Sequence, residues 1–236
     1  MAADSLPPFF SRVVPVIRHD AIIVFAKLPE PGKVKTRLLG LLSAEEAAEV
    51  HSACLRDTVS LVNSLPQCAK FLMLAGNPTA AQRFAQGLGL SARWRVAPQQ
   101  GRDLGARLDD AFRQLWRSGA QRVVVIGTDT PWMGARKIRQ VFAALHRVDV
   151  VIGPTVDGGY YLIGARKPVP QVFAGISWGT RRVLSQSLTA LRKARLSYRL
   201  LLRDFDLDRP DDLARVRGLY QRGGCKSPEL EKWLRR

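Results

Sequence analysis

A cluster of basic residues near the start of the chain offers the clearest chemistry. The apolar run at residues 22–26 is rich in β-branched and aromatic side chains and is ended by proline and glycine, which predicts a buried strand. The segment that follows contains Lys27, Gly32, Lys33, Lys35 and Arg37. Ligands of open α/β sheets gather where strands end, and lysine point charges, a bidentate guanidinium and flexible glycine backbone suit a phosphate or diphosphate. The segment therefore predicts a phosphate-binding loop, although it has neither P-loop nor dinucleotide-fold spacing. A solvated basic turn is the alternative.

A single aspartate follows the most apolar strand that the sequence predicts. Residues 123–127 are expected to form this strand, and Asp129 follows it after Thr128. The carboxyl end of a central strand is where an α/β ligand site is expected. Magnesium binds through one or two carboxylates together with substrate phosphate oxygens. Asp129 is therefore predicted to be a metal ligand.

A second acidic segment lies far along the chain. Asp204, Asp206 and Asp208 alternate with apolar residues, so an extended strand would place the three carboxylates on one face. We expect Asp206 or Asp208 to be the second metal ligand. A helix is expected to begin just after this segment, so capping is the alternative for Asp208 and the favoured interpretation for Asp211 and Asp212.

A pair of glycines lies between the two acidic segments. Asp157, Gly158 and Gly159 form a turn signal, and a hairpin loop before a strand at residues 161–164 is the plain interpretation. Paired glycines also permit close backbone approach to a ligand. In that interpretation Asp157 and the aromatic Tyr160 are candidates for holding an acceptor.

Apolar strands and amphipathic helices alternate along the chain. The expected strands lie at residues 22–26, 71–75, 94–97, 123–127, 149–153 and 161–164, and the expected helices at 43–65, 80–88, 103–118 and 134–146. This alternation is typical of an α/β fold with a mostly parallel sheet and helices on both faces. There is no low-complexity linker or internal repeat. We therefore expect one domain at residues 20–236, preceded by a flexible arm at residues 1–19.

Composition restricts the classes of partner. The chain carries 37 Lys and Arg against 20 Asp and Glu, a formal net charge of +17 that favours polyanions. The arginines are scattered and accompany no zinc-finger, RRM or KH signature, so no specific nucleic-acid partner is predicted. Three cysteines without C-x-x-C spacing indicate neither a disulfide framework nor a zinc site. With no long apolar run and no signal peptide, we expect a cytoplasmic protein without a membrane span.

Four stretches together resemble a known family. They are residues 25–38 around the basic loop, 127–131 around Asp129, 157–164 after the glycine pair, and 206–208 in the second acidic segment. In this order, over about residues 20–220, the chain resembles the DUF2064 family of glycosyltransferase A-like proteins. More distantly it is similar to 2-phospho-L-lactate guanylyltransferases and molybdenum-cofactor nucleotidyltransferases.

The resemblance implies a fold and a set of roles. The fold is the three-layer α/β/α Rossmann-like nucleotide-diphospho-sugar transferase (GT-A) fold, with a mixed, mostly parallel sheet. Lys27, Lys35 and Arg37 take the phosphate-loop role, Asp129 binds Mg²⁺ or Mn²⁺, and Asp206 or Asp208 supplies the second ligand.

We expect a metal-dependent transferase that uses a nucleotide-activated donor and a small-molecule acceptor. Glycosyl transfer from a nucleotide sugar is placed ahead of nucleotidyl transfer with release of pyrophosphate, and the non-enzyme alternative is a nucleotide- or nucleic-acid-binding module. The catalytic candidates are Asp129, Asp157 and Lys35, and the candidates for binding the nucleotide are Lys27, Gly32, Lys35, Arg37, Gly158 and Gly159.

Overall fold

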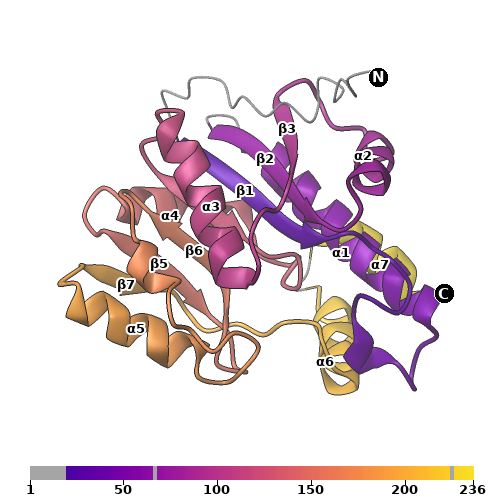
Figure 1. The fold of residues 1–236 in the computed structure, drawn as a ribbon. Helices are drawn as coiled ribbons and strands as arrows, with labels where there is room; N and C mark the ends of the chain where they lie inside the picture. Colours follow the sequence, from indigo (N-terminus) through magenta and orange to yellow (C-terminus); the bar gives the residue numbers. More distant parts are fainter. Residues whose placement is uncertain (1–19, 66–67, 224–225) are drawn as a thin grey trace.

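The protein folds around one mixed sheet (Figure 1). The computed structural model describes residues 20–65, 68–223 and 226–236, so the expected arm at residues 1–19 lies outside the described residues. In the described part, seven strands pair in the order β3-β2-β1-β4-β6-β5-β7. Their bounds are β1 Asp20–Lys27, β2 Cys68–Ala75, β3 Trp94–Pro98, β4 Val123–Ile126, β5 Val150–Pro154, β6 Tyr160–Ala165 and β7 Tyr198–Leu200.

Most neighbouring strands run parallel. β1 pairs in parallel with β2 and β4, as β2 does with β3 and β5 with β7. β6 is the exception, because it pairs antiparallel with both β4 and β5. Because β1 and β4 are parallel, their carboxyl ends lie side by side at the same end of the sheet. The α/β fold class that the sequence predicts is confirmed.

Helices cover both faces of the sheet. Their bounds are α1 Ala44–Asn63, α2 Pro78–Gln86, α3 Leu104–Arg117, α4 Ala135–Ala144, α5 Val183–Lys193, α6 Pro210–Gln221 and α7 Pro228–Leu234. Apolar residues of α1, α2 and α4 pack in one core with one face of the strands, and those of α3 and α5 pack in a second core with the other face. This is the three-layer α/β/α arrangement that the resemblance implies.

A third, smaller apolar cluster lies beyond the sheet. It joins the basic loop, α1, the second acidic segment, α6 and α7, through Leu38, Cys54, Phe205, Leu207 and Leu213 among others. Two of its members, Phe205 and Leu207, alternate with acidic residues. Their burial therefore fixes where the neighbouring carboxylates lie.

The expected elements are present with small shifts at their ends. Helix α1 begins after Ser43, whose side chain accepts from Glu46 N at 3.1 Å, while Ser43 N donates to the Glu46 carboxylate at 2.8 Å. This is the capping box that the sequence predicts. Asp212 also caps as expected, because its Oδ2 accepts from Arg209 N at 2.7 Å and Asp208 N at 3.1 Å. Among the described helices, none is long and apolar enough to cross a bilayer.

A buried carboxylate joins three strand ends at the β5 side of the sheet. Asp149 accepts from Ser197 N at 3.0 Å and from Arg166 Nε at 3.0 Å, and pairs with Lys167 Nζ at 3.0 Å. Burial alone would raise the pKa of Asp149, but hydrogen bonds from Lys167, Ser197 and Arg166 outweigh it and hold this pKa well below its usual range. Asp149 therefore stabilises the fold as an anion.

We expect Asp149→Asn to lower the midpoint of thermal unfolding at neutral pH. A carboxylate whose pKa is depressed in the folded state contributes stability above its unfolded pKa of about 4, and this contribution is lost as the pH falls. The difference in midpoint between variant and wild type should therefore shrink as the pH is lowered from about 5 towards 3. A difference that stays constant over this range would contradict the assignment.

Candidate functional site

The site lies where β1 and β4 end side by side. In the register of these parallel strands, Val24 is opposite Ile126, so the basic loop after β1 and Asp129 after β4 leave the sheet at one edge. The acidic segment reaches the same place from far along the chain, because Leu207 N donates to Asp129 O at 2.8 Å. The structure thus brings the basic loop and both predicted acidic segments together.

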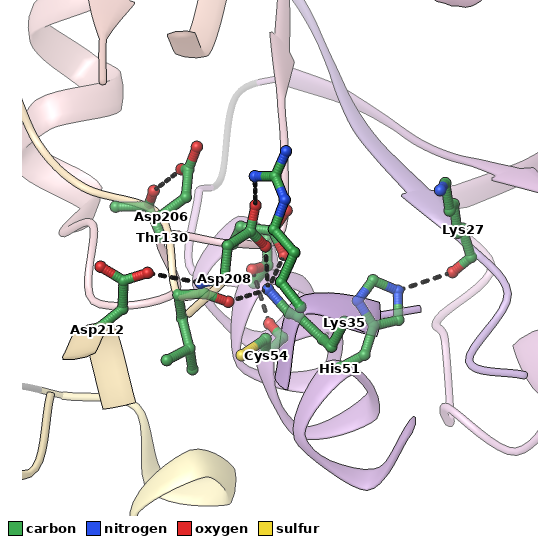
Figure 2. Close-up of polar contacts among 12 residues, drawn as sticks. Lys27, Lys35, His51, Cys54, Thr130, Asp206, Asp208 and Asp212 are labelled. Atoms are coloured by element: carbon green, nitrogen blue, oxygen red, sulfur yellow. Dashed lines mark hydrogen bonds and ion pairs between the residues drawn. The ribbon is translucent and has the colours of Figure 1, made fainter. Parts of the chain in front are cut away.

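Lys35 lies at the centre of this cluster (Figure 2). Its ammonium donates to the Asp129 carboxylate and to the carbonyl of Leu207, and it lies 3.3 Å from Asp208 Oδ1. Only 2% of the Lys35 side chain is exposed, against 38% for Asp129 and 33% for Asp208. The lysine is therefore enclosed, while both carboxylates keep one side towards solvent.

The backbone of Lys35 is unusual as well. Its φ of 49° and ψ of 35° lie in the left-handed region, which residues other than glycine rarely adopt. It immediately precedes the short 3-10 helix η2 Thr36–Leu38, whose Leu38 is buried in the third apolar cluster. Burial of Leu38 on one side and the ion pairs on the other hold Lys35 in this conformation.

The charges in the cluster shift one another's titration. Burial acts to lower the pKa of Lys35, but Asp129 and Asp208 more than offset it and raise this pKa above its usual range. Burial acts to raise the pKa of Asp129, and Lys35 outweighs it, so that this pKa is lowered. Lys35 and Asp129 are therefore a charged pair.

Asp206 has a different environment. Its Oδ1 accepts from Thr130 Oγ1 at 3.0 Å, and it makes no ion pair with any residue that the structure describes. Burial, followed by the negative charge of Asp129, raises the pKa of Asp206 to about 8. Burial and Asp129 also raise the pKa of Asp208, despite its contact with Lys35. The cluster therefore has more carboxylates than cations to neutralise them.

Asp204 does not join the other two aspartates of its segment. The expected extended strand is absent at residues 204–208, where the structure has an isolated bridge between Thr155 and Asp204. The Asp204 carboxylate accepts from Trp132 Nε1 at 3.1 Å and pairs with Lys137 Nζ at 2.9 Å. The expectation of three carboxylates on one face is therefore wrong, because Asp204 is a structural contact to α4 and the turn before it.

The remaining basic residues lie around the rim of the cluster. The Arg37 side chain is 51% exposed, with Nη1 at 3.6 Å from Asp208 Oδ2. Lys27 and Lys33 are exposed, and Lys33 pairs with Glu30. Gly32 has a φ of +73° and open space around it. Lys35 was expected to contact phosphate, but its ammonium already contacts oxygen atoms of the protein. The exposed residues of the loop are therefore the ones available to bind a phosphate.

The glycine pair serves the packing of a neighbouring loop. Gly158 has a φ of +93°, and a Cβ there would lie 2.2 Å from Arg181 O. Asp157 Oδ1 accepts from Gly159 N at 3.1 Å and from Thr155 Oγ1 at 2.5 Å, which closes the turn. The close approach that Gly158 permits is to protein backbone, which corrects the interpretation of this glycine as a ligand contact.

Tyr160 is likewise directed into the fold. Its ring packs edge-on against Trp178 with centroids 6.1 Å apart. Tyr160 is therefore a packing residue here, and Asp157 is the member of this stretch that lies near the cluster, since its charge contributes to the raised pKa of Asp206.

Three residues that contribute to the site were not predicted to do so from the sequence. Thr130 holds Asp206, and the Leu207 carbonyl binds Lys35. His51, on α1, lies 3.0 Å through Nε2 from Lys27 O, and burial lowers its pKa, so it is a neutral link between α1 and the start of the loop. Thr130 is adjacent to Asp129, which is the one signal that pointed towards it.

The acidic residues of the cluster can be compared with the needs of a divalent cation. No group of three or more His, Cys, Asp or Glu side chains is arranged as a metal cage in the part of the chain that the structure describes. Magnesium needs fewer protein ligands when substrate phosphates complete its shell. Carboxylate oxygens are its preferred donors, and Asp206 is a partly buried carboxylate without a cationic partner among the described residues. The residues fit a cation that is bound together with a phosphorylated substrate.

Comparison with known proteins places the chain in a family. The model of the family described as uncharacterized protein conserved in bacteria (DUF2064) matches residues 58–180. A solved structure, a putative nucleotide-diphospho-sugar transferase from Desulfovibrio desulfuricans, is 33% identical, with a TM-score of 0.84 over 92% of this chain and 94% of that one. The chain belongs to the DUF2064 family.

Two relatives with lower sequence identity are named as guanylyltransferases. A phosphoenolpyruvate guanylyltransferase from Chloroflexus aggregans is 28% identical over 74% of this chain and 86% of its own length. A 2-phospho-L-lactate guanylyltransferase from Halorubrum lacusprofundi is 25% identical over 85% of this chain and 86% of its own length. The predicted family and its distant similarity to guanylyltransferases are confirmed, and this DUF2064 protein is a transferase of the glycosyl or nucleotidyl type.

We expect Lys35→Met to destabilise the protein by about 2 kcal/mol or more, because the carboxylates of Asp129 and Asp208 lose their enclosed counter-charge. The loss of unfolding free energy should be smaller than the roughly 3–5 kcal/mol that is typical when a fully buried ion pair is broken. The reason is that both carboxylates are partly exposed. Urea unfolding followed by circular dichroism measures it. Arg37→Ala is the matched control and should change stability by less than about 0.5 kcal/mol. Equal stability of Lys35→Met and wild type would refute the central role of the ammonium.

Gly158→Ala should destabilise the fold more than Gly179→Ala. Both glycines have positive φ, +93° and +76°, but open space surrounds only Gly179. Alanine at Gly179 meets backbone strain of about 1–2 kcal/mol, and alanine at Gly158 adds a clash worth roughly 1–3 kcal/mol. Thermal unfolding of the two variants provides the comparison. A smaller loss at Gly158 than at Gly179 would show that Arg181 does not press on this turn.

Proposed function

We propose that this protein is a metal-dependent nucleotidyltransferase, which joins a nucleoside monophosphate from a triphosphate to a small phosphorylated acceptor and releases pyrophosphate. The supporting observation is the cluster of Asp129, Asp206 and Asp208 around Lys35, next to an exposed basic rim at the β1 and β4 ends. The names of the two guanylyltransferase relatives favour nucleotidyl transfer over glycosyl transfer. In this proposal, residues 20–236 form one catalytic domain, and the reaction takes place in the cytoplasm.

The chemistry divides among a few residues. Arg37, with the exposed Lys27 and Lys33, binds the triphosphate and offsets its charge. An oxygen of the acceptor attacks the α-phosphorus, the bond from that phosphorus to the bridging oxygen breaks, and pyrophosphate leaves. Mg²⁺ or Mn²⁺ would be held by Asp129 and Asp206, where it supplies electrostatic stabilisation of the transferring phosphate. Asp208 stays with Lys35 and Arg37.

Lys35 takes a positioning role in this proposal. Its ammonium holds Asp129 and the Leu207 carbonyl in place and offsets part of the negative charge before any substrate arrives. Preorganised charges of this kind supply rate because they need no rearrangement during the reaction. Asp157 is near enough to influence Asp206 and is the candidate contact for the acceptor.

Glycosyl transfer from a nucleotide sugar is the second candidate. The similarity to the solved putative nucleotide-diphospho-sugar transferase from Desulfovibrio desulfuricans supports it. The same cluster would then stabilise a departing nucleoside diphosphate, and the acceptor would be a hydroxyl group. The two candidates differ in the leaving group, which an assay distinguishes directly.

We expect GTP with phosphoenolpyruvate or phospholactate, in the presence of Mg²⁺, to yield pyrophosphate. Asp206→Asn should lower the rate by about 100-fold or more, because it removes an anionic ligand at the transferring phosphate. Asp211→Asn is the control, since Asp211 is exposed in the first turn of α6. Coupled pyrophosphate detection measures both variants, and circular dichroism checks their fold. Turnover of UDP-sugars without pyrophosphate release would favour the second candidate, and full activity of Asp206→Asn would contradict the proposed site.

A further inference from the structure

The positive charge of this protein is concentrated in one segment. Residues 158–203 contain nine Lys or Arg and no Asp or Glu, so more than half of the formal net charge of +17 comes from this stretch. It includes β6, α5 and β7, and all nine basic residues are exposed. This segment therefore contributes a large net positive charge to the surface that it forms.

Most of these cations have no carboxylate to offset them. Arg166 and Lys167 pair with Asp149. The other seven make no ion pair within residues 20–65, 68–223 and 226–236. Unpaired arginines on a surface attract anions over about a Debye length, roughly 8–10 Å at ordinary salt. This part of the molecule is a candidate surface for a negatively charged partner.

The surface lies at an edge of the sheet. β7 pairs only with β5 and is the last strand in the sheet order, and α5 lies beside it in Figure 1. We define the β7 edge as Arg192, Arg195, Arg199, Leu200, Leu202 and Arg203. Arginines along an edge strand oppose pairing with the strand of another chain. A second copy of this sheet is therefore a poor occupant.

Apolar side chains are exposed among these arginines. Leu202 is 85% exposed and Leu200 is 41% exposed. Leu202 is followed directly by Arg203, and Arg199 precedes Leu200. Exposed leucines that are flanked by arginines in sequence suit the boundary between lipid headgroups and acyl chains, where the arginines meet phosphate and the leucines leave water.

We propose that the β7 edge docks this protein on an anionic membrane surface. Single-stranded nucleic acid shares the charge complementarity, but it is bound on aromatic side chains that stack with bases. The β7 edge offers exposed leucines, and the aromatic residue of β7, Tyr198, is partly buried in the core with α5. Leucine has no flat π face, so lipid is the better match. This proposal is independent of the reaction at the Lys35 cluster.

The experiment is co-sedimentation of the full chain with two kinds of vesicle. One contains phosphatidylcholine alone, and the other contains phosphatidylcholine with phosphatidylglycerol. We expect binding to the anionic vesicles, reduced by added salt, and little binding to the neutral ones. The double variant Arg192→Glu/Arg199→Glu should weaken partitioning by about tenfold or more, since each basic residue near an anionic leaflet contributes substantially. Leu202→Ser should weaken it severalfold at unchanged charge.

A matched control separates this surface from the net charge. Arg83→Glu/Arg93→Glu makes the same change in charge at exposed positions on α2 and just before β3, at the opposite edge of the sheet. This variant should keep its vesicle binding. An equal loss in the control, or no binding to anionic vesicles, would overturn the proposal. Stronger binding to single-stranded RNA than to vesicles, lost in the β7-edge variant and unaffected by Leu202→Ser, would assign the surface to nucleic acid instead.

Discussion

The enclosed ammonium of Lys35 is the interaction on which the rest of the site depends. It joins the basic loop to two segments that are far away in sequence, through the Asp129 carboxylate after β4 and through the Leu207 carbonyl and Asp208 carboxylate of the acidic segment. Without this cation, the carboxylates would repel one another in a place that water only partly reaches. The position of Asp206 is fixed in addition by its neighbours Phe205 and Leu207, which are buried in the third apolar cluster.

Buried apolar residues position the charged groups of the site. In the acidic segment, Phe205 and Leu207 are buried, while Asp206 accepts from Thr130 and Asp208 pairs with Lys35. In the basic loop, Leu38 has the same function for Lys35. Apolar burial thus supplies the free energy that holds like charges close together, which electrostatics alone would oppose. An excess of carboxylate over ammonium remains, and it is this excess that makes a phosphate-bound cation chemically suitable.

Sequence reasoning succeeded where a local pattern decides structure. The capping box at Ser43 and Glu46 depends on neighbouring residues alone, and the apolar runs of β1 and β4 are decided by burial on both faces. It failed for Asp204, because alternation cannot reveal that Lys137 and Trp132 are close enough to take its carboxylate. It also assigned Gly158 to a ligand, since the sequence does not show that the backbone at Arg181 packs there. Long-range contacts decided both cases.

The late return of the acidic segment has a consequence for how the protein matures. The strands β1 to β6 pair among residues 20–165, yet the Leu207 peptide must still arrive to receive the Lys35 ammonium and to donate to Asp129. Contacts of such sequence separation form late in folding, since loop closure costs entropy first. On the ribosome, where chains emerge from the N-terminus, most of the sheet is therefore synthesised before the site can exist. The site can therefore form only after the segment at residues 204–208 has emerged and docked against Lys35 and Asp129.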